Sequence, residues 1–329
     1  MYESPFHKTD LSKFSFLVTG GCGFIGSNIV EYLLKYNAGK VVVLDNISTG
    51  FRKNIEPFLS KNNFKFIEGD ITDSGICRTA CEGIDYINHQ AALGSVPRSV
   101  KDPQATHAVN STGFLNMLVG ARDAGVKRFV FASSSSVYGD HPVLPKKEEE
   151  TGNPLSPYAV TKKTNELYAM VFGPTYGMEI IGLRYFNVFG PNQSPEGAYA
   201  AVIPLFMQAV INKTAPYIDG DGEQTRDFTF VENAVQANIR SFFTEKKEAL
   251  NQVYNVAVGE NISVNKLYDM IAELGGSDVK AIHRETRAGD IRNSLADISK
   301  IRERIQYDPK IKVQEGLKIA FDWFKKNFH

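Results

Sequence analysis

The sequence predicts an α/β fold in which a doubly wound parallel sheet is followed by a smaller C-terminal α/β lobe. Three observations support this prediction. Short apolar runs alternate with amphipathic helical patterns up to residue 184, a glycine-rich turn follows the first apolar run, and turn residues become frequent beyond about residue 185. The strands of the sheet are expected at 14–19, 40–45, 63–68, 84–89, 127–132 and 178–184.

The first strand ends in a glycine-rich turn that leads into a helix. Gly20, Gly23 and Gly26 have the spacing G-x-x-G-x-x-G, and the apolar residues that follow recur at helical intervals. In such a turn, backbone N–H groups and the positive end of the helix dipole can meet a pyrophosphate group. The spacing differs from the common G-x-G-x-x-G fingerprint, and a tight turn before a helix is the simpler alternative.

The second strand ends in an acidic residue, Asp45, about 20 residues after the glycines. At this position a carboxylate can accept hydrogen bonds from the hydroxyl groups of a ribose. The same negative charge would repel a 2′-phosphate, so Asp45 favours NAD over NADP as the ligand.

The ends of the third and fourth strands carry residues that suit the same ligand. The Asp70 carboxylate can accept from an adenine amino group while Ile71 packs on the ring, although a helix-capping aspartate is an equally good interpretation. Residues 90–95 are mostly small, which lets the backbone approach a ligand. Because ligands of open α/β sheets bind beyond the carboxyl ends of the strands, we expect these segments to meet at one edge.

A serine run follows the fifth strand, and a tyrosine and a lysine follow on the next helical segment, 155–176. Tyr158 and Lys162 are four residues apart, so on a helix they share one face. A phenol with a pKa of about 10 is a poor base at pH 7, but a nearby ammonium and an oxidised nicotinamide both favour the phenolate. The phenolate can then take a proton from a substrate hydroxyl while hydride leaves the same carbon, with a serine hydroxyl holding the oxygen. Each of these patterns alone is common on protein surfaces.

The change in sequence texture divides the chain into two domains. We expect a dinucleotide-binding domain at 1–184 and a mainly substrate-binding domain at 185–329, with some later segments, about 227–258, returning to the first. Residues 1–13 are polar and are expected to form a loose lead-in. Helical patterns lie at 202–212, 231–245, 263–274 and 314–327, and the last carries a stripe typical of a core-facing helix, Leu317, Ala320, Phe321 and Phe324.

The composition argues against several classes of partner. Lysine plus arginine and aspartate plus glutamate number 37 each, so the charge balance indicates neither a nucleic acid nor a membrane partner. No stretch approaches the roughly 18 to 20 apolar residues that span a bilayer, and no signal-peptide pattern precedes Phe14. Cys22, Cys77 and Cys81 lack metal-ligand spacing and are expected to be reduced, which fits a cytoplasmic protein without a bound metal.

Taken together, the glycine turn, the strand-end acids, the serines and the Tyr158/Lys162 pair resemble the extended short-chain dehydrogenase/reductase family over roughly residues 14–327. The resemblance implies a Rossmann lobe that holds NAD, with Ser134 as the catalytic serine, Ser135 close by, Tyr158 as the base and Lys162 as its partner. It also implies a homodimer formed through two helices near 101–121 and 155–176. The implied cofactor contacts are Gly20, Gly23, Phe24, Ile25, Gly26, Asp45, Asn46, Ser48, Thr49, Gly50, Asp70, Ile71, Gln90, Ala91, Ala92, Asn110, Tyr158, Lys162 and Tyr185.

Within that family the sequence is most similar to the NAD-dependent UDP-hexose 4-epimerases, particularly the bacterial group that acts on UDP-N-acetylglucosamine. The family's dehydratases carry Thr-Asp-Glu before a Val-Tyr-Gly, where this chain has Ser134, Ser135 and Ser136, so dehydration is not expected. By resemblance, Asn187, Arg226 and Arg287 contact the diphosphate of a UDP-sugar, and 199–204 with 217–219 surround the uracil. The implied substrate contacts are Gly94, Ser95, Ser134, Ser135, Asn187, Gln193, Tyr199, Ala201, Val202, Tyr217, Asp219, Arg226, Arg287, Asp290 and Ser294.

The residue at position 294 predicts which sugars are accepted. In the related epimerases this position is a wall of the hexose pocket, where a tyrosine excludes a 2-acetamido group and a small residue admits it. Ser294 is small, so UDP-GlcNAc and UDP-GalNAc are expected to fit, alongside UDP-glucose and UDP-galactose. Three alternatives stay open: 4-epimerisation of the corresponding uronic acids with Arg98 or Lys163 on the carboxylate, a decarboxylase or reductase of the same family, and a non-catalytic NAD-binding regulator. The presence of Ser134, Tyr158 and Lys162 argues against the regulator.

Overall fold

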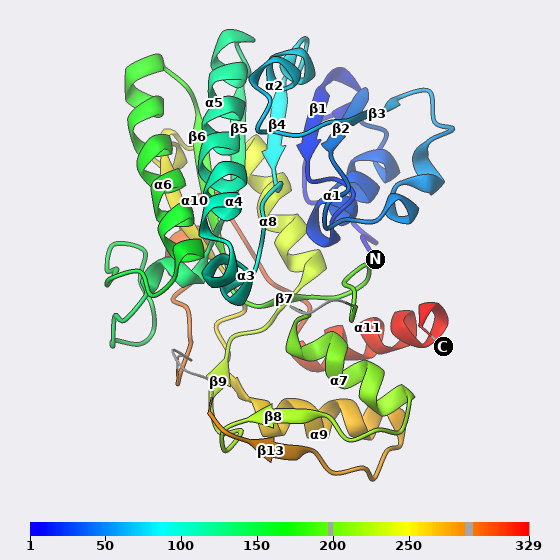
Figure 1. The fold of residues 1–329 in the computed structure, drawn as a ribbon. Coiled ribbons are helices and arrows are strands. Elements are labelled where there is room, and N and C mark those ends of the chain that lie inside the picture. The colour runs from blue at the N-terminus through cyan, green and yellow to red at the C-terminus, as the bar shows by residue number, and fades with distance from the viewer. Residues whose placement is uncertain (197–199, 287–291, 329) are drawn as a thin grey trace.

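The structure is a computed structural model that describes residues 1–196, 200–286 and 292–328, and a parallel sheet is its central layer (Figure 1). Within those residues the sheet has seven strands in the order β11-β6-β5-β4-β1-β2-β3, and each neighbouring pair is parallel. The strands are β1 (Ser15–Thr19), β2 (Lys40–Asp45), β3 (Phe64–Glu68), β4 (Tyr86–His89), β5 (Arg128–Ser134), β6 (Ile180–Tyr185) and β11 (Gln252–Val256).

Six of these strands lie within two residues of the predicted limits at each end, and the predicted doubly wound sheet is confirmed. The strand order reverses at β1, which has β2 on one side and β4 on the other. Such a reversal opens a crevice at the carboxyl ends of the two central strands. The edge strand β11 comes from late in the chain, inside the segment 227–258. The division of the chain at residue 184 stays a prediction.

Helices cover both faces of the sheet, so its strands are buried on both sides. Alternate residues of β1 show this, because Phe16 and Val18 join one hydrophobic core and Leu17 joins the other. The first core is closed by α1 (Phe24–Lys35), α8 (Val231–Phe243) and α10 (Ser299–Ile305). The second is closed by α2 (Ser74–Cys81), α5 (Gly113–Asp123) and α6 (Pro157–Tyr176).

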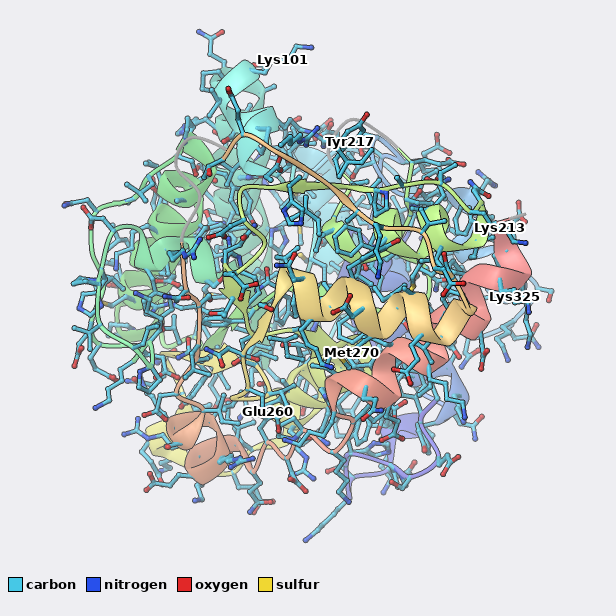
Figure 2. The ribbon with its side chains drawn as sticks, turned by 90° about the horizontal axis from the view of Figure 1, so that it is seen from below. Lys101, Lys213, Tyr217, Glu260, Met270 and Lys325 are labelled. Carbon is cyan, nitrogen blue, oxygen red and sulfur yellow. The ribbon has the colours of Figure 1, made fainter. Side chains whose placement is uncertain are left out.

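A smaller lobe lies beyond the carboxyl ends of the sheet strands (Figure 1). Its core is formed by α7 (Val202–Ile211), α9 (Val264–Gly275) and α11 (Val313–Asn327). Figure 2, which views the molecule from below, shows α9 and α11 side by side on the outer surface of this lobe. The predicted apolar stripe of the last helix is confirmed as core-facing, because its four residues are all less than 8% exposed.

Short strand pairs and connecting helices complete the described chain. The pairs are β7 (Val188–Phe189) with β10 (Thr229–Phe230), β8 (Tyr217–Asp219) with β13 (Ile282–Arg284), and β9 (Thr225–Arg226) with β12 (Ile262–Ser263). The connecting elements are α3 (Val96–Lys101), α4 (Pro103–His107), η1 (Leu11–Lys13), η2 (Arg52–Asn54), η3 (Glu56–Phe58), η4 (Ala108–Thr112), η5 (Ser135–Tyr138) and η6 (Lys247–Ala249).

The expectation of a loose N-terminal lead-in is wrong. Tyr2 is completely buried, and its hydroxyl donates to Asn28 on α1. The ring of Phe6 stacks on Tyr32 of α1 with 5.1 Å between ring centres, and its backbone N–H donates to the Tyr32 hydroxyl at 2.7 Å. The segment is polar on average, but its two aromatic residues Tyr2 and Phe6 each bury a large apolar area when they pack. They fix the segment against α1.

None of the helices described within residues 1–196, 200–286 and 292–328 combines the length and the apolar character needed to cross a lipid bilayer.

Candidate active site

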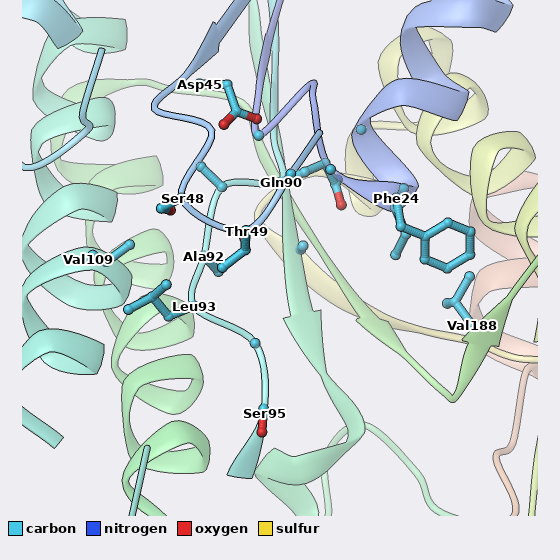
Figure 3. Close-up of a pocket in the computed structure, with 18 of the residues that line it drawn as sticks. Phe24, Asp45, Ser48, Thr49, Gln90, Ala92, Leu93, Ser95, Val109 and Val188 are labelled. Atoms are coloured by element: carbon cyan, nitrogen blue, oxygen red, sulfur yellow. The ribbon is translucent and has the colours of Figure 1, made fainter. Parts of the chain in front are cut away.

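A cavity of about 660 Å³ lies at the carboxyl edge of the sheet, where the strand order reverses. It is continuous from the glycine turn after β1 to Tyr158 and Lys162 on α6. Figure 3 shows the side chains that line it, with Asp45 at one end of the view and Ser95 at the other. The predicted meeting of these segments at one edge is thus what the structure shows, and ligands of open α/β sheets bind at this location.

The glycine turn is packed too closely for side chains. Gly20 has a φ of +68°, and a Cβ added at Gly26 would lie only 2.2 Å from the Gly20 carbonyl oxygen. The N-cap of α1 is Gly23, which has no side chain to satisfy the first N–H groups of the helix. The cavity therefore meets a helix N-terminus with free N–H donors, which fits a pyrophosphate group.

The Asp45 side chain is held rigidly at the end of β2. One carboxylate oxygen accepts from the Cys22 backbone N–H at 2.9 Å, and the other accepts from the Ile47 N–H at 2.7 Å. Burial raises the pKa of Asp45, while these backbone hydrogen bonds act in the opposite direction. Each carboxylate oxygen has a second lone pair, so the fixed side chain can still accept from a ribose hydroxyl.

Asp70 lines the cavity and does not cap the helix that follows it, because the N-cap of α2 is Asp73. Its carboxylate accepts from the backbone N–H and the hydroxyl of Thr72, both at 2.8 Å, and from the side-chain amide of Asn46 at 2.7 Å. Burial works to raise the pKa of Asp70, but these hydrogen bonds outweigh it and hold the pKa below its ordinary value. The helix-capping interpretation of Asp70 is therefore wrong, and the adenine contact stays a prediction that its place in the cavity lining suits.

Tyr158 and Lys162 lie on the first turns of α6, which begins at Pro157 and is capped by the Ser156 hydroxyl. The Lys162 ammonium lies 5.9 Å from the centre of the Tyr158 ring and donates to the Ala132 carbonyl at 2.8 Å. That carbonyl belongs to the end of β5, two residues before Ser134. The predicted pair thus shares one helical face that points at the strand end carrying the serine.

The electrostatic environment of the pair is set mainly by burial. Burial lowers the pKa of Lys162 to about 8, opposed by the negative charge of Glu166. Burial also raises the pKa of Tyr158, and the hydrogen bond between Tyr158 and Ser134 opposes this rise. At pH 7 Lys162 is therefore mainly an ammonium and Tyr158 a neutral phenol. A further positive charge beside the phenol is needed before it can act as a base at neutral pH.

A buried ion pair that the sequence analysis did not identify supports α6 from behind. Glu166 accepts two hydrogen bonds from the Arg184 guanidinium, at 2.8 and 2.9 Å, and a third from the Ser133 hydroxyl at 2.6 Å. Glu166 follows Lys162 by four residues, so helical spacing alone could have placed the two on one face. The pair ties α6 to the ends of β5 and β6, which carry Ser134 and Tyr185.

Most of the predicted cofactor contacts line the cavity. Asn110 does not; it holds the 91–95 segment instead, because its side-chain amide bonds both the N–H and the carbonyl of Leu93. The predicted residues in the lining are Gly20, Gly23, Phe24, Ile25, Gly26, Asp45, Asn46, Ser48, Thr49, Gly50, Asp70, Ile71, Gln90, Ala91, Ala92, Tyr158, Lys162 and Tyr185.

The predicted substrate contacts are divided between the cavity and its surroundings. Gly94, Ser95, Ser134, Asn187, Gln193 and Ala201 line the cavity, whereas Ser135, Val202, Tyr217, Asp219, Arg226 and Ser294 are outside its lining. Tyr199, Arg287 and Asp290 lie outside the described residues. The lining also includes Ala200, from the segment expected around the uracil, and Arg98, named for the uronic-acid alternative. Lining residues that the sequence analysis did not predict as contacts are Leu44, Phe51, Gly69, Leu93, Val109, Ala132, Ser133, Val188, Asn192, Ser194 and Glu196.

The predicted contacts outside the lining belong mainly to the smaller lobe. Tyr217 is 60% exposed, and Asp219 pairs with Arg284 beside it. Arg226 donates to the Thr225 carbonyl at 2.9 Å, and the Ser294 backbone N–H donates to that same carbonyl group at 3.1 Å. The cavity lining therefore does not include these residues.

Among the described residues, no cluster of three or more His, Cys, Asp or Glu side chains suits a metal ion.

One cavity at the edge of a parallel sheet holds the glycine turn, Asp45 at the end of β2, and Ser134 with Tyr158 and Lys162. This combination defines a dinucleotide-dependent enzyme of the Rossmann type. A family model described as GDP-mannose 4,6 dehydratase matches residues 17–320. The chain belongs to the extended short-chain dehydrogenase/reductase family, in its branch of NAD-dependent nucleotide-sugar 4-epimerases.

Three similar proteins illustrate the range of this branch. A putative UDP-glucose 4-epimerase of Methanocaldococcus jannaschii is 37% identical over 313 residues, which are 94% of this chain and 98% of that protein. A UDP-N-acetylglucosamine 4-epimerase of Methanobrevibacter ruminantium, solved with UDP-N-acetylmuramic acid, is 40% identical, with a TM-score of 0.90 and coverage of 96% and 99%. A UDP-glucuronic acid 4-epimerase variant of Bacillus cereus, solved with NAD and a fluorinated UDP-glucuronic acid, is 29% identical, with a TM-score of 0.89 and coverage of 95% and 100%.

Proposed function

We propose that this protein interconverts UDP-GlcNAc and UDP-GalNAc by inverting carbon 4 of the sugar through a 4-keto intermediate. The observation that carries the proposal is the contact between Tyr158 and Ser134 beside Lys162, inside the same cavity as the glycine turn. UDP-glucose and UDP-galactose are included as further substrates. The product is an activated sugar of the kind that glycosyltransferases consume, which fits precursor supply for surface polysaccharides.

The cofactor is NAD, in keeping with related structures that contain it. The free N–H groups at the start of α1 would hold the pyrophosphate of NAD. The Asp45 carboxylate would accept hydrogen bonds from the hydroxyl groups of its adenosine ribose. When bound, NAD⁺ supplies the hydride acceptor at carbon 4, and its reduced form supplies the hydride donor. An oxidised nicotinamide beside the Tyr158 ring would lower the pKa of the phenol and so oppose the effect of its burial.

The residues of the chain then perform the proton chemistry. The Ser134 hydroxyl holds the C4 oxygen of the sugar while the Tyr158 phenolate removes its proton. The Lys162 ammonium, fixed by the Ala132 carbonyl, stabilises the phenolate. After the keto sugar has turned about its diphosphate, Tyr158 returns the proton to the C4 oxygen as hydride arrives on the other face. The reaction inverts carbon 4 with no net oxidation.

Elimination of water is not supported by this site. The matching family model is described for a dehydratase, but Ser134, Ser135 and Ser136 occupy the positions where the dehydratases carry Thr-Asp-Glu. A serine hydroxyl is too weak an acid to protonate a leaving hydroxyl group in place of a carboxylic acid. This difference favours epimerisation.

The sugar nucleotide is proposed to lie between the two lobes. Asn187 lines the cavity and donates to the Asp227 carbonyl at 3.0 Å, which anchors it where the second lobe begins. Arg226 and Arg287 are proposed to bind the diphosphate, because charge-assisted bonds from guanidinium groups suit phosphate oxygens. Residues 199–204 and 217–219 are proposed to surround the uracil.

The proposal is tested by incubating the purified enzyme with UDP-GlcNAc, without added NAD, and following UDP-GalNAc by NMR. An equilibrium mixture of the two sugars supports the proposal, because the cofactor is recycled in each turnover. Stoichiometric release of NADH, or absence of UDP-GalNAc even after NAD is added, contradicts it.

Ser294→Tyr is expected to reduce turnover of UDP-GlcNAc about 5- to 150-fold, which corresponds to an overpacking cost of roughly 1–3 kcal/mol. The reason is that the ring would occupy the space of the 2-acetamido group. Turnover of UDP-glucose should be preserved, and Ser294→Ala serves as the matched control because it adds no bulk. Wild-type rates on UDP-GlcNAc in the tyrosine variant would refute the assignment of Ser294 as a pocket wall.

The second candidate is 4-epimerisation of the corresponding UDP-hexuronic acids. One observation favours it: Arg98 lines the cavity next to Ser95, where a guanidinium could meet a C6 carboxylate. A related protein is named as a UDP-glucuronate 4-epimerase. Initial rates on UDP-GlcNAc and on its uronic acid, measured side by side, decide between the two. Faster turnover of the uronic acid would replace the first candidate with the second.

A homodimer through the face of α6 is proposed as well, because this helix leaves apolar side chains exposed. Val160, Leu167 and Val171 are 50%, 49% and 53% exposed and recur at intervals of seven and four residues, which places them on one helical face. Met170 beside them is 60% exposed. An apolar stripe of this kind is typical of a helix that packs on another protein surface.

The dimer is tested with the double substitution Leu167→Glu and Val171→Glu. The wild-type protein is expected to have twice the chain mass of 36.5 kDa in light scattering after size exclusion, and the double variant the mass of a single chain. Leu274→Glu on α9 is the control, because Leu274 is also partly exposed but lies on the other lobe. A wild-type monomer, or a dimer that survives the double substitution, contradicts the proposal.

A further inference from the structure

The N-terminal segment, Met1–Phe6, is docked on the same helix that begins at the glycine turn (Figure 1). Tyr2 is 0% exposed, its backbone N–H donates to Glu232 of α8 at 3.1 Å, and its carbonyl accepts from the Tyr36 hydroxyl at 2.9 Å. Burial raises the pKa of Tyr2 well above its ordinary value, so its hydroxyl is a neutral donor. The segment is thus a packed element of the first core.

Asn28 connects this segment to a distant part of the chain. The Tyr2 hydroxyl is 3.1 Å from both the carbonyl oxygen and the side-chain oxygen of Asn28. The Asn28 side-chain nitrogen donates to the Phe24 carbonyl at 2.9 Å and to the Pro191 carbonyl at 3.0 Å. Asn28 is completely buried, so each of these polar contacts is costly to lose.

Pro191 opens the loop 191–196, which forms the second-lobe side of the cavity. The loop has another bond to α1, because the Asn192 side chain donates to the Ser27 hydroxyl at 3.1 Å. Asn192, Gln193, Ser194 and Glu196 all line the cavity. The helix that begins at the glycine turn therefore also fixes this loop.

One loop side chain has an unfilled hydrogen-bonding position. The Gln193 side-chain nitrogen donates to the Val188 carbonyl at 3.2 Å, but its side-chain oxygen is buried without a partner among the described residues. A buried acceptor of this kind calls for a donor. In a cavity that takes a UDP-sugar, a sugar hydroxyl or an amide N–H is a donor of the right class.

We propose that Tyr2 and Asn28 are positioning residues for the sugar nucleotide: the N-terminal segment locks Asn28, and Asn28 holds the loop 191–196 with Gln193 in its binding position. The inference rests on the proposed function, since the ligand it concerns is a UDP-sugar. Without the Tyr2 hydroxyl, the Asn28 side-chain oxygen is left buried without a donor, and the side chain that holds the Pro191 carbonyl loses one of its three hydrogen bonds. The loop then has to be ordered by the substrate, which weakens substrate binding without altering the chemical step.

The kinetic test uses Tyr2→Phe and Asn28→Ala. We expect the KM for UDP-GlcNAc to rise about tenfold in both variants, with kcat within twofold of wild type, since uniform binding is lost. Tyr32→Phe is the matched control. Its hydroxyl also anchors the segment, through the Phe6 N–H, but it has no hydrogen bond to Asn28. An unchanged KM in Tyr2→Phe, or an equal rise in Tyr32→Phe, overturns the inference.

A second measurement needs no substrate. Amide hydrogen exchange of residues 192–196 is expected to be faster in Tyr2→Phe and Asn28→Ala than in wild type and Tyr32→Phe. If exchange in this loop is unchanged in Tyr2→Phe and Asn28→Ala, the link between the segment and the loop is refuted. If exchange changes as expected but the wild-type protein turns over no UDP-sugar, the proposed function fails and the positioning of the loop stands.

Discussion

Tyr158→Phe is expected to slow epimerisation by about 10²–10⁴-fold at saturating substrate, the range that a positioned acid–base group contributes. The phenyl ring fills the same space, but it cannot take the C4 proton or return it. Because only the hydroxyl is lost, NAD content and thermal stability should match those of wild type. The measurement is the turnover rate by NMR or a coupled assay, together with the absorbance of bound cofactor.

The matched control for this variant is Tyr168→Phe on the same helix. Tyr168 is 36% exposed and does not line the cavity, so its hydroxyl has no route to the substrate. A Tyr158→Phe enzyme that works within a few-fold of wild type would reject Tyr158 as the base. Equal losses in both variants would mean that α6 had been disturbed rather than the chemistry.

Lys162→Met is expected to make the protein nearly inactive and also more stable. The folded protein lowers the pKa of Lys162 from 10.5 to about 8, so folding at pH 7 buries an ammonium at a cost of about 3 kcal/mol. Methionine removes that cost and loses a hydrogen bond to the Ala132 carbonyl, worth about 1 kcal/mol. The net gain of about 2 kcal/mol should raise Tm on the order of 4 °C.

Loss of the ammonium in Lys162→Met removes the charge that stabilises the phenolate, so turnover should slow at least about 10²-fold.

The pH dependence of stability provides the sharper measurement for this variant. Between about pH 8 and 10.5 the unfolded wild-type chain holds a proton that the folded protein has lost from Lys162. Wild-type stability from this group therefore rises with pH across that window, and the penalty is fully present below pH 8. In Lys162→Met this rise should be absent, whereas Lys318→Met on the exposed side of α11 should keep it. A Lys162→Met protein that is less stable than wild type at pH 7 contradicts the expectation.

The parts of the fold that could be predicted from the sequence are those set by local patterns. A strand that is buried on both faces has a nearly continuous apolar run in its sequence. The run at 40–45 is an example, and β2 has the limits predicted from it. The proximity of Tyr158 and Lys162 could be predicted for a similar reason, because one helical turn joins the two residues. The cavity lining after β2, β3 and β4 followed from the rule that strand ends share an edge.

The parts that could not be predicted depend on contacts between distant segments. Glu166 meets Arg184 and Ser133 only after three elements have packed, and no spacing in the sequence links them. The N-terminal segment is polar on average, whereas two of its aromatic residues, Tyr2 and Phe6, determine where it lies. Local patterns in the second lobe predicted its helices but not which side chains face the cavity, because that depends on how the two lobes meet.

The late position of β11 has a consequence for how the protein is made. Until residue 256 has left the ribosome, β6 is the outermost strand of a growing sheet and offers bare N–H and carbonyl groups to any neighbour. The Arg128 guanidinium at the start of β5 donates to the carbonyls of Ser241, Phe242 and Thr244, which are synthesised more than 100 residues later. Until then it lacks these three acceptors. Nascent chains of intermediate length are therefore the aggregation-prone species, and they are the ones that a chaperone has most reason to shield.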